Sequence, residues 1–537
     1  MRPRGGGDHL ASRVVSELSE MANWLTSLPD AETMRGVDRW AIEERGVESL
    51  ELMERAGAGV AQAVEEIAAD GPVAVLCGKG NNGGDGLVAA RLLREAGREV
   101  LVLCTAPLED LGGDALVNLE RLPGADPIVL DGAANEPIAD AAVIVDALLG
   151  TGFEGEPHGP VGEAIEAINA AHVPVVSVDV PSGVDASTGM VAGSAVDASV
   201  TVTFHAPKPG LWIRPGKGHA GRVQRIDIGI PRGAPGEASI GLLESSVLNV
   251  LPRREATGTK FASGHVLVVG GSLGLTGAPA MAARASMRAG AGYVTACVPA
   301  SLQAILAGGG TPEVMTVGLP DEGGTLTEEG VARVLEASGR GGALALGPGL
   351  GRSAGAVVFA RRLAQQATVA MVLDADGLNA HAGALATLAS RRAPTVLTPH
   401  AGELGRLLEC ESSEVERARL THVREAAERA EAIVVLKGDD TLIADPGGMV
   451  AVSPGGSPAL ATAGTGDVLT GVIAALLAQG LEPFTAACAG VWLHAEAGRR
   501  AATLLGAAEG VIASDVIAAL PAARTPAERP RRGRRRG

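Results

Sequence analysis

The residues best suited to chemistry are Gly464, Gly466 and Asp467, in a glycine-rich segment that precedes a long apolar run. This spacing predicts a tight turn that opens a helix, with the Asp467 carboxylate at the helix N-terminus. Unpaired backbone N–H groups and the helix dipole favour anions there, so the turn could hold a phosphate while Asp467 exchanges a proton. An enzyme that activates a hydroxyl group against a nucleotide phosphate needs this arrangement. An ordinary helix start with an acidic cap is the alternative interpretation.

Other segments of the second half also follow predicted strands. Residues 270–279 and 347–351 are rich in glycine, which allows the backbone to approach a ligand closely. His400 follows the strand predicted at residues 395–397, where it is either a ligand-binding side chain or an incidental loop histidine. Residues 437–441, Lys-Gly-Asp-Asp-Thr, suit a turn over nucleotide phosphates, and a simple hairpin turn is the competing interpretation.

The first half carries a glycine- and asparagine-rich loop at residues 78–86, after a predicted strand and before a predicted helix. Its G-x-G-x-x-G spacing formally matches a dinucleotide-binding loop. The next predicted strand, residues 100–104, is followed by no acidic residue that could hold a ribose hydroxyl, so a dehydrogenase is the weakest interpretation. The amides of Asn81 and Asn82 indicate a nucleotide-contacting loop with additional polar contacts.

Two further predicted strands of the first half end in acids, Asp146 and Asp179. Because ligands bind at the carboxyl ends of strands in an open parallel sheet, we expect these acids to converge with Asn82. The oxygen donors of Asn82, Asp146 and Ser182 suit a hard cation rather than zinc. Helix capping or turn formation is the alternative role of either acid. Lys208, in a proline-constrained loop, balances a phosphate, acts as an acid or is a plain surface lysine.

Short β-type runs alternate with helical patterns along the chain, which predicts two α/β domains, each with a parallel sheet. A linker rich in Pro and Gly at residues 230–237 separates them, and a long amphipathic stretch at residues 34–69 packs on the first sheet. The predicted strands are residues 73–77, 100–104, 127–130, 143–146 and 175–179, then 265–269, 343–346, 369–374, 395–397 and 433–436, and a helix is predicted over 84–96. The predicted organisation is a polar extension (1–25), a Rossmann-like three-layer α/β/α domain (26–235), a second α/β domain (236–520) and a basic disordered tail (521–537).

The composition restricts the classes of function. A net charge of −17 disfavours nucleic acid as a partner of the folded body. The content of 46% hydrophobic residues, 2% aromatic residues and 75 glycines suits parallel α/β layers with tight loops. No apolar run reaches 18 residues and no signal-peptide pattern opens the chain, so we expect no membrane partner. The five scattered cysteines predict reduced core residues and a cytoplasmic location.

Four motifs of the first half, taken in chain order, resemble those of NAD(P)H-hydrate epimerases. They are the loop at residues 81–85, the segment 146–152, the turn 179–183 and the element 206–208, and the resemblance covers residues 28–230. The resemblance implies potassium binding by the oxygen donors Asn82, Asp146 and Ser182. The acid and base of the reaction are expected to be Asp179 and Lys208. By the same resemblance, the residues that would contact a hydrated nicotinamide nucleotide are Asn81, Asn82, Gly83, Gly84, Asp85, Gly150, Thr151, Gly152, Phe153, Glu154, Gly155, Glu156 and Asp179.

The glycine-rich and polar segments of the second half resemble ADP- or ATP-dependent NAD(P)H-hydrate dehydratases, over residues 255–520. The resemblance implies a ribokinase-like fold, with ADP or ATP as co-substrate and Mg²⁺ as a cofactor. The residues that would contact the hydrate are Ala278, Gly349, His400 and Asp467. The residues that would bind ADP are Lys437, Gly438, Asp439, Asp440, Thr441 and Gly466.

Both families occur fused in bacterial NAD(P)H-hydrate repair enzymes, which is the resemblance of the whole chain. The expected function is to epimerise R and S hydrates of NADH and NADPH at C6 and to dehydrate the S form with ADP or ATP. A ribokinase-like kinase of a vitamin or sugar alcohol is the alternative enzyme, and a catalytically silent nucleotide- or RNA-binding first domain is the alternative of another class. The resemblance also implies small-molecule nucleotides as partners and allows a homo-oligomer.

Overall fold

The computed structural model describes residues 21–130, 135–236, 238–309, 311–339 and 341–525. They form two compact units, one containing Ser27–Gly241 and the other containing Asn23–Thr26 and the chain from Leu242 onward. Strand β1 (Leu25–Ser27) begins inside the predicted polar extension, and helix α18 (Ala513–Ala523) continues past the predicted start of the tail. The rest of both predicted termini, residues 1–20 and 526–537, lies outside the described residues.

The first unit is built on a parallel sheet, as the alternation of strands and helices predicted. Its order is β4-β3-β2-β5-β6-β7-β8, and every neighbouring pair runs parallel. The central strands are buried on both faces, which explains their continuous apolar sequence. The bounds are β2 (Val73–Cys77), β3 (Val100–Cys104), β4 (Ile128–Val129), β5 (Val143–Ala147), β6 (Val175–Val178), β7 (Val200–Phe204) and β8 (Arg222–Ile226).

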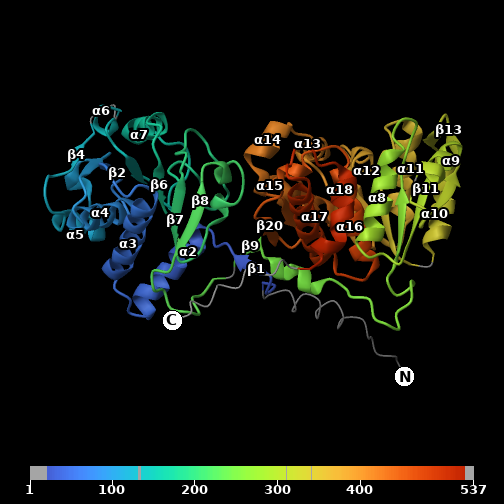
Figure 1. Ribbon diagram of the computed structural model, residues 1–537, viewed down its shortest axis with the longest axis horizontal. Coiled ribbons are helices and arrows are strands. Elements are labelled where there is room, and N and C mark those ends of the chain that lie inside the picture. Colours follow the sequence, from blue (N-terminus) through green and yellow to red (C-terminus); the bar gives the residue numbers. More distant parts are fainter. Residues whose placement is uncertain (1–20, 131–134, 237, 310, 340, 526–537) are drawn as a thin grey trace, which may run out of the picture. The chain divides into compact units, whose positions relative to one another are not determined.

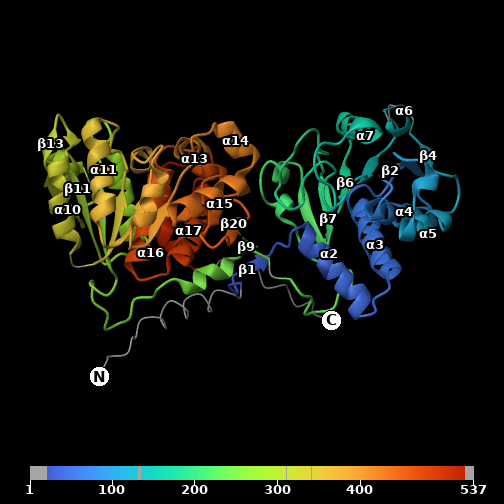
Figure 2. The same ribbon diagram turned by 180° about the vertical axis from the view of Figure 1, so that it is seen from behind.

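Helices cover both faces of this sheet, so the predicted three-layer α/β/α domain is confirmed. Val73, Val75 and Cys77 of β2 pack in one apolar core, whereas the alternate residues Ala74 and Leu76 pack in a second core. The first core includes residues of α2 (Ala31–Arg39), α3 (Ser49–Ile67) and α4 (Asn81–Glu95), and α5 (Gly113–Glu120) packs beside α4. The second includes residues of α6 (Asn135–Ile138) and α7 (Gly159–Ala170), and Figures 1 and 2 show α3 and α7 on opposite sides of the strands.

The amphipathic stretch at residues 34–69 packs on the sheet as predicted, whereas the helix predicted over 84–96 was wrong in its start. The long amphipathic stretch is divided, because α2 ends in a π-helical turn (Trp40–Glu44) and Gly46 adopts a left-handed backbone (φ +67°) before α3. Helix α4 begins at Asn81 rather than at residue 84, so the predicted loop residues form its first turn. Glycines are needed in this turn because Gly83 packs closely on the Gly78 carbonyl and Gly84 on the Met53 side chain.

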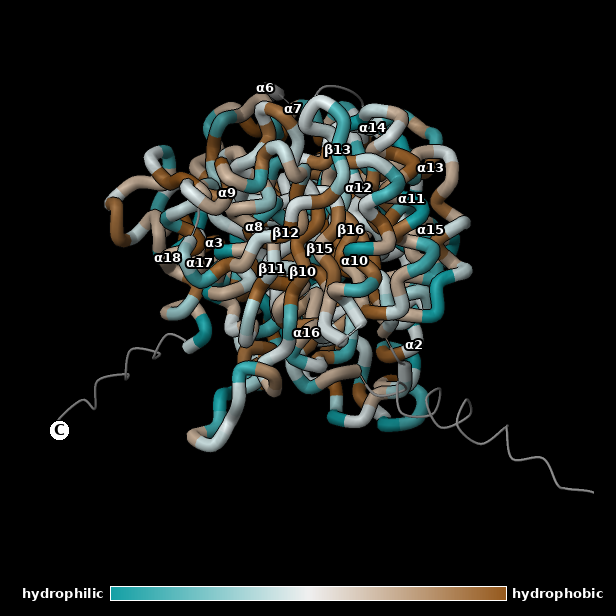
Figure 3. The backbone as a smooth tube through the Cα atoms, turned by 90° about the vertical axis from the view of Figure 1, so that its right-hand side faces the viewer, coloured by the Kyte–Doolittle hydropathy of each residue, from teal (hydrophilic) through white to brown (hydrophobic). Residues whose placement is uncertain are grey.

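The second unit contains a sheet in the order β1-β9-β20-β19-β18-β17-β16-β15-β10-β11-β12. The strands from β18 to β12 run parallel, whereas β18, β19 and β20 form an antiparallel meander. Figure 3 shows the apolar colouring along its central strands, among them β10 and β15. The bounds are β9 (Ile240–Leu243), β10 (His265–Val269), β11 (Tyr293–Pro299), β12 (Val314–Leu319), β15 (Ala343–Leu346), β16 (Ala370–Leu373), β17 (Thr395–Leu397), β18 (Ile433–Leu436), β19 (Leu442–Ala444) and β20 (Val450–Val452), with a separate small hairpin of β13 (Asp321–Glu322) and β14 (Thr325–Leu326).

The most buried helix of this unit is α16 (Thr465–Ala478), which packs on β10, β15 and β16 and against α8 (Gly277–Arg288). Helices α17 (Pro483–Leu505) and α18 pack on it in turn. The other helices are α9 (Gln303–Gly309), α10 (Val331–Ser338), α11 (Ala354–Gln366), α12 (Asp376–Asn379), α13 (Ala401–Leu408), α14 (Ser412–Arg417) and α15 (Arg419–Ala430). This architecture confirms the predicted second α/β domain.

In each sheet the strand order reverses once among the parallel strands. The chain proceeds from β2 to β3 and β4 on one side and returns with β5 on the other side of β2. The second sheet does the same between β10 and β15. Crevices at the carboxyl ends of the strands, next to such a reversal, are where open α/β sheets bind ligands. Each unit therefore has one predicted location for a site.

Candidate active sites

A cavity of about 800 Å³ opens at the strand-order reversal of the first unit. The loops after β2 and β5 form part of its wall, and side chains of α2 and α3 complete it. Its volume lies in the range typical of small-molecule sites. The predicted site residues that line it are Asn81, Asn82, Asp85, Gly150, Thr151, Gly152, Phe153, Asp179 and Lys208. The predicted residues that do not line it are Gly83 and Gly84, which are buried, and Glu154, Gly155 and Glu156, which are exposed.

Two glycines of the loop after β2 are required by close backbone contacts. A Cβ atom at Gly78 would lie 2.0 Å from the Leu148 carbonyl oxygen. A Cβ atom at Gly83 would lie 1.9 Å from the Gly78 carbonyl oxygen. The start of α4 is thereby held against the loop after β5, and both loops are fixed where they line the cavity.

The ion pair of Lys208 and Asp179 lies at the base of the cavity. The Lys208 ammonium donates to Asp179 Oδ1 at 2.5 Å, to Thr203 Oγ1 at 3.0 Å and to the Phe204 carbonyl at 3.0 Å. Thr151 donates to the other carboxylate oxygen of Asp179. Burial raises the pKa of Asp179, but the charge and hydrogen bond of Lys208 outweigh it and hold the pKa below its usual value. Asp179 also adopts a left-handed backbone (φ +66°), a conformation that is strained for a non-glycine residue.

Two more carboxyl groups face the same cavity, Asp85 of α4 and Asp38 of α2. Burial raises the pKa of both groups, and the Asp179 carboxylate raises it further, whereas Lys208 opposes these effects. Asp85 was predicted as a site residue and Asp38 was not. Asp38 lies in an amphipathic helix with no local motif, so only the packing of α2 against the sheet reveals it.

The predicted cation-binding residues are also adjacent to this cavity. The Asp146 carboxylate is fully buried and accepts hydrogen bonds from Ser177 at 2.7 Å and from the Ser182 backbone and hydroxyl at 2.9 and 2.5 Å. Asn82 packs on Gly150, where a Cβ atom would lie 3.0 Å from its amide oxygen. Burial raises the pKa of Asp146 even though these hydrogen bonds lower it.

In the second unit, glycine-rich strand ends meet at the reversal between β10 and β15. A Cβ atom at Gly270 would lie 2.1 Å from the Pro348 carbonyl oxygen, and Ser272 donates to the Gly349 carbonyl at 2.9 Å. Gly349 adopts a left-handed backbone (φ +63°), and a Cβ atom there would lie 3.2 Å from that of Ala278. The predicted hydrate-binding residues Ala278 and Gly349 are thus neighbours.

Lys437, at the end of β18, is the centre of a charged cluster in this unit. Its ammonium lies 3.0 Å from Asp374 Oδ1 and 3.6 Å from Glu403 Oε2. Asp374 is 2% exposed and also accepts hydrogen bonds from Thr398 and Thr470, both at 2.8 Å. Burial lowers the pKa of Lys437, but Asp374 and Glu403 outweigh it and keep the pKa above its usual value. The sequence did not predict a role for Asp374 or Glu403.

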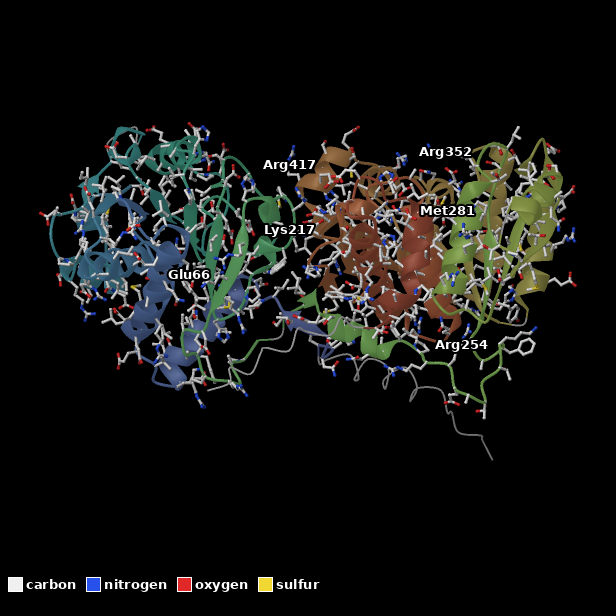
Figure 4. All side chains as sticks on the ribbon, viewed as in Figure 1. Glu66, Lys217, Arg254, Met281, Arg352 and Arg417 are labelled. Atoms are coloured by element: carbon white, nitrogen blue, oxygen red, sulfur yellow. The ribbon has the colours of Figure 1, made fainter. Side chains whose placement is uncertain are left out.

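Asp467 lies in the first turn of α16, beside this cluster. Its helix begins after Gly464, which has a left-handed backbone (φ +89°) and packs on Met281 of α8 (Figure 4), where a Cβ atom would lie 2.6 Å from the sulfur. A Cβ atom at Gly466 would lie 3.6 Å from the Lys437 ammonium. Burial, reinforced by Asp374, raises the pKa of Asp467 to about 7, although Lys437 lowers it. A carboxyl group with this pKa exchanges protons readily at neutral pH.

His400 is the N-cap of α13 and lies beside the cluster. Its Nδ1 accepts from the backbone N–H groups of Gly402 and Glu403 at 3.0 and 3.3 Å, and its Nε2 lies 3.6 Å from Glu403 Oε2. Burial lowers the pKa of His400, and Lys437 lowers it further against the opposing effect of Glu403. A ring whose Nδ1 caps a helix presents Nε2 to its surroundings, which suits a hydrogen bond to a ligand.

Residues 437–441 form the turn of the β18–β19 hairpin, which was the competing interpretation of their sequence. Asp440 is fully buried and pairs with Arg419, itself 2% exposed, at 3.0 Å. Thr441 donates to the Gly438 carbonyl at 2.7 Å within the turn. Asp440 and Thr441 therefore shape the turn, while Gly438 and Asp439 lie on its exposed side.

Relatives of this chain extend over nearly its whole length. A repair enzyme of Moorella thermoacetica, "Bifunctional NAD(P)H-hydrate repair enzyme Nnr", is 42% identical over 92% of this chain and 96% of its own. An enzyme of the same name from Salinibacter ruber is 41% identical over 94% and 97%. This chain belongs to the bifunctional NAD(P)H-hydrate repair enzyme family.

Each half of this family member also matches a separate family. Residues 49–210 match the YjeF-related protein N-terminus, and residues 266–522 match NAD(P)H-hydrate dehydratase. Among solved structures, the ADP/ATP-dependent NAD(P)H-hydrate dehydratase of Bacillus subtilis is 28% identical and covers 52% of this chain and 94% of its own, with a TM-score of 0.44. The two matched ranges contain the Lys208–Asp179 pair and the Lys437 cluster, whereas Asp38 lies before the first range.

Within residues 21–525, apart from the four short undescribed gaps, no group of three or more His, Cys, Asp or Glu side chains is arranged to hold a metal ion. No helix among the described residues is both long and apolar enough to cross a membrane.

Proposed function

We propose that this family member repairs hydrated NADH and NADPH with its two sites. The first unit interconverts the R and S hydrates at C6, and the second dehydrates the S hydrate at the expense of ADP or ATP. The observation that supports this most directly is the position of Asp467, whose pKa is about 7, at the glycine-rich start of a helix and beside the Lys437 cluster.

In the dehydratase site, Asp467 takes the proton of the C6 hydroxyl as that oxygen attacks the terminal phosphoryl group of the nucleotide. The N–H groups at the start of α16 and the Lys437 ammonium stabilise the charge on the transferred group. Phosphate then leaves C6 as the ring nitrogen supplies its electron pair. Loss of a proton from C5 restores the double bond, so the products are reduced nicotinamide nucleotide, phosphate and AMP or ADP.

The nucleotide is proposed to lie over the turn 437–441, with Gly466 beside its phosphates. Gly438 and Asp439 are on the exposed side of the turn, whereas the buried Arg419–Asp440 pair fixes its shape. His400 and the Ala278–Gly349 contact would hold the hydrate. Mg²⁺ is usually bound through substrate phosphates with one or two carboxylates, so it needs no dedicated protein cage.

In the epimerase site, potassium is proposed to bind Asn82, Asp146 and Ser182. The Asp146 carboxylate is fully buried, and no cationic side chain of the described residues contacts it. A buried carboxylate without a counter-charge is costly, which fits a bound monovalent cation. Potassium would supply charge compensation there and hold the loop after β5, which carries Gly150 and Thr151.

The test is recovery of near-ultraviolet absorbance when the purified chain is mixed with R and S NADPH hydrates, Mg²⁺, K⁺ and either ADP or ATP. Complete recovery of both epimers is expected. Recovery of the S share alone would contradict the epimerase assignment, and no recovery with either nucleotide would contradict the dehydratase assignment. Replacing K⁺ by Na⁺ should slow epimerisation in the wild type and have a smaller effect in Asp146→Asn, whereas an equal effect in both would contradict potassium binding at Asp146.

A further inference from the structure

The Lys208–Asp179 pair has little freedom to exchange a proton with a substrate. An ammonium group carries three protons, and those of Lys208 are all donated within the protein, to Asp179, Thr203 and the Phe204 carbonyl. Both carboxylate oxygens of Asp179 already accept hydrogen bonds, from Lys208 and Thr203 on one side and Thr151 on the other. Lys208 is also 1% exposed. The pair is thus a fixed dipole in the cavity wall.

Asp38 and Asp85 differ from this pair in their contacts. Both line the cavity, one from α2 and one from α4, yet neither makes a hydrogen bond or ion pair with another described residue. Asp85 is 9% exposed, so it is a buried carboxyl group whose partner must come from the cavity contents. The partly exposed Asp38 faces the same space.

We propose that Asp38 is a catalytic residue of the epimerase site, which exchanges protons with the C6 oxygen in partnership with Asp85, while Lys208 and Asp179 position the substrate. The proposal deepens the proposed epimerase function and rests on it. The raised pKa values of both carboxyl groups support it, because burial and the neighbouring Asp179 carboxylate favour the protonated form of each group.

The chemistry needs no reactant other than the water that it releases. One carboxyl group donates its proton to the C6 hydroxyl, the C6–O bond breaks, and water leaves with the bonding pair. The ring nitrogen supplies its lone pair to form a C6=N1 double bond. Water then adds to C6, the double-bond electrons return to nitrogen, and the other carboxylate takes the excess proton. Addition to the opposite face inverts C6, and solvent returns the proton between the two groups.

The test uses the full chain with pure S hydrate and no nucleotide, and follows the R epimer by chromatography. Asp38→Asn and Asp85→Asn should each slow R formation by about 10²–10⁴-fold, as expected for loss of an acid–base group. With ADP added, dehydration of the S hydrate should stay near the wild-type rate, and an unchanged melting temperature of the first unit should show that the variants are folded. Asp38→Glu keeps a carboxyl group and should retain more activity than Asp38→Asn. Glu32→Gln, an exposed carboxylate of the same helix, should behave as wild type.

Each result distinguishes this proposal from the function on which it rests. If the wild type forms no R epimer, the epimerase assignment itself is wrong. If the wild type is active and Asp38→Asn matches it, only the role of Asp38 is overturned. A variant that loses substrate affinity at unchanged turnover would also overturn that role, because Asp38 would then shape the cavity rather than carry a proton.

Discussion

The ionisation of Asp467 gives the most specific quantitative prediction. With a pKa of about 7, the carboxyl group is about one-tenth ionised at pH 6 and about nine-tenths ionised at pH 8. If the ionised form is the base of the dehydratase, the turnover rate should rise about tenfold between these values. A carboxylate with the ordinary pKa of 3.8 would give a flat profile over the same range.

The charged neighbours of Asp467 allow the midpoint of this profile to be moved in opposite directions. Asp374→Asn removes a negative charge that raises the pKa of Asp467, so the midpoint should move to lower pH. Lys437→Met removes a positive charge that lowers the pKa, so the midpoint should move to higher pH. Glu428→Gln, an exposed carboxylate of α15, is the matched control and should leave the midpoint unchanged.

The assay is the initial rate of absorbance recovery from the S hydrate at saturating nucleotide, corrected for the reaction without enzyme. The midpoint is the informative quantity, because loss of Lys437 is also expected to reduce the maximal rate. A flat wild-type profile, or midpoints that move the same way in both variants, would refute the assignment of Asp467 as the base.

Other predictions follow from the same contacts. Asp467→Asn should lower dehydration by about 10²–10⁴-fold. Because the folded pKa of about 7 lies above the unfolded value, ionisation destabilises the fold as the pH rises, so this variant should melt higher than wild type at pH 8 but not at pH 4. Gly83→Ala places a Cβ atom 1.9 Å from the Gly78 carbonyl and should abolish epimerisation while dehydration persists. In the control variant Gly80→Ala, the added Cβ atom meets no atom within 4 Å, so the melting temperature of the first unit should stay unchanged. Gly438→Ala would place its Cβ atom 2.5 Å from the buried Arg419 side chain and distort the turn, so the KM for ADP should rise several-fold. An unchanged KM would show that the turn does not bind the nucleotide.

Several strands could be predicted from their apolar local sequence, whereas others, such as β7 and β11, were not predicted. The runs 73–77 and 265–269 are apolar without alternation, and the observed strands have those same bounds. Both follow the rule for parallel strands covered on two faces. The start of α4 could not be predicted in this way, because its glycines are poor helix formers and are selected by contacts with Gly78 and Met53.

Site residues could be predicted from the sequence where they directly follow a strand, and less readily where they lie within a helix. Asp179 and Lys437 were found from strand ends, and Asp374 follows β16 in the same manner, so the same reasoning applied to that strand would have found it. Asp38 has no such signal. It reaches the cavity through the packing of α2 against residues more than a hundred positions away, which only the tertiary structure provides.

The central claim is that the two sites act in sequence, and pure R hydrate tests it most directly. With ADP, Mg²⁺ and K⁺, the wild type should restore the full near-ultraviolet absorbance, because the first unit converts R to S and the second consumes S. Asp467→Asn should restore almost none while still equilibrating the R and S epimers. Full recovery from R hydrate by Asp467→Asn, or no recovery by a wild type that consumes S hydrate, would contradict the account.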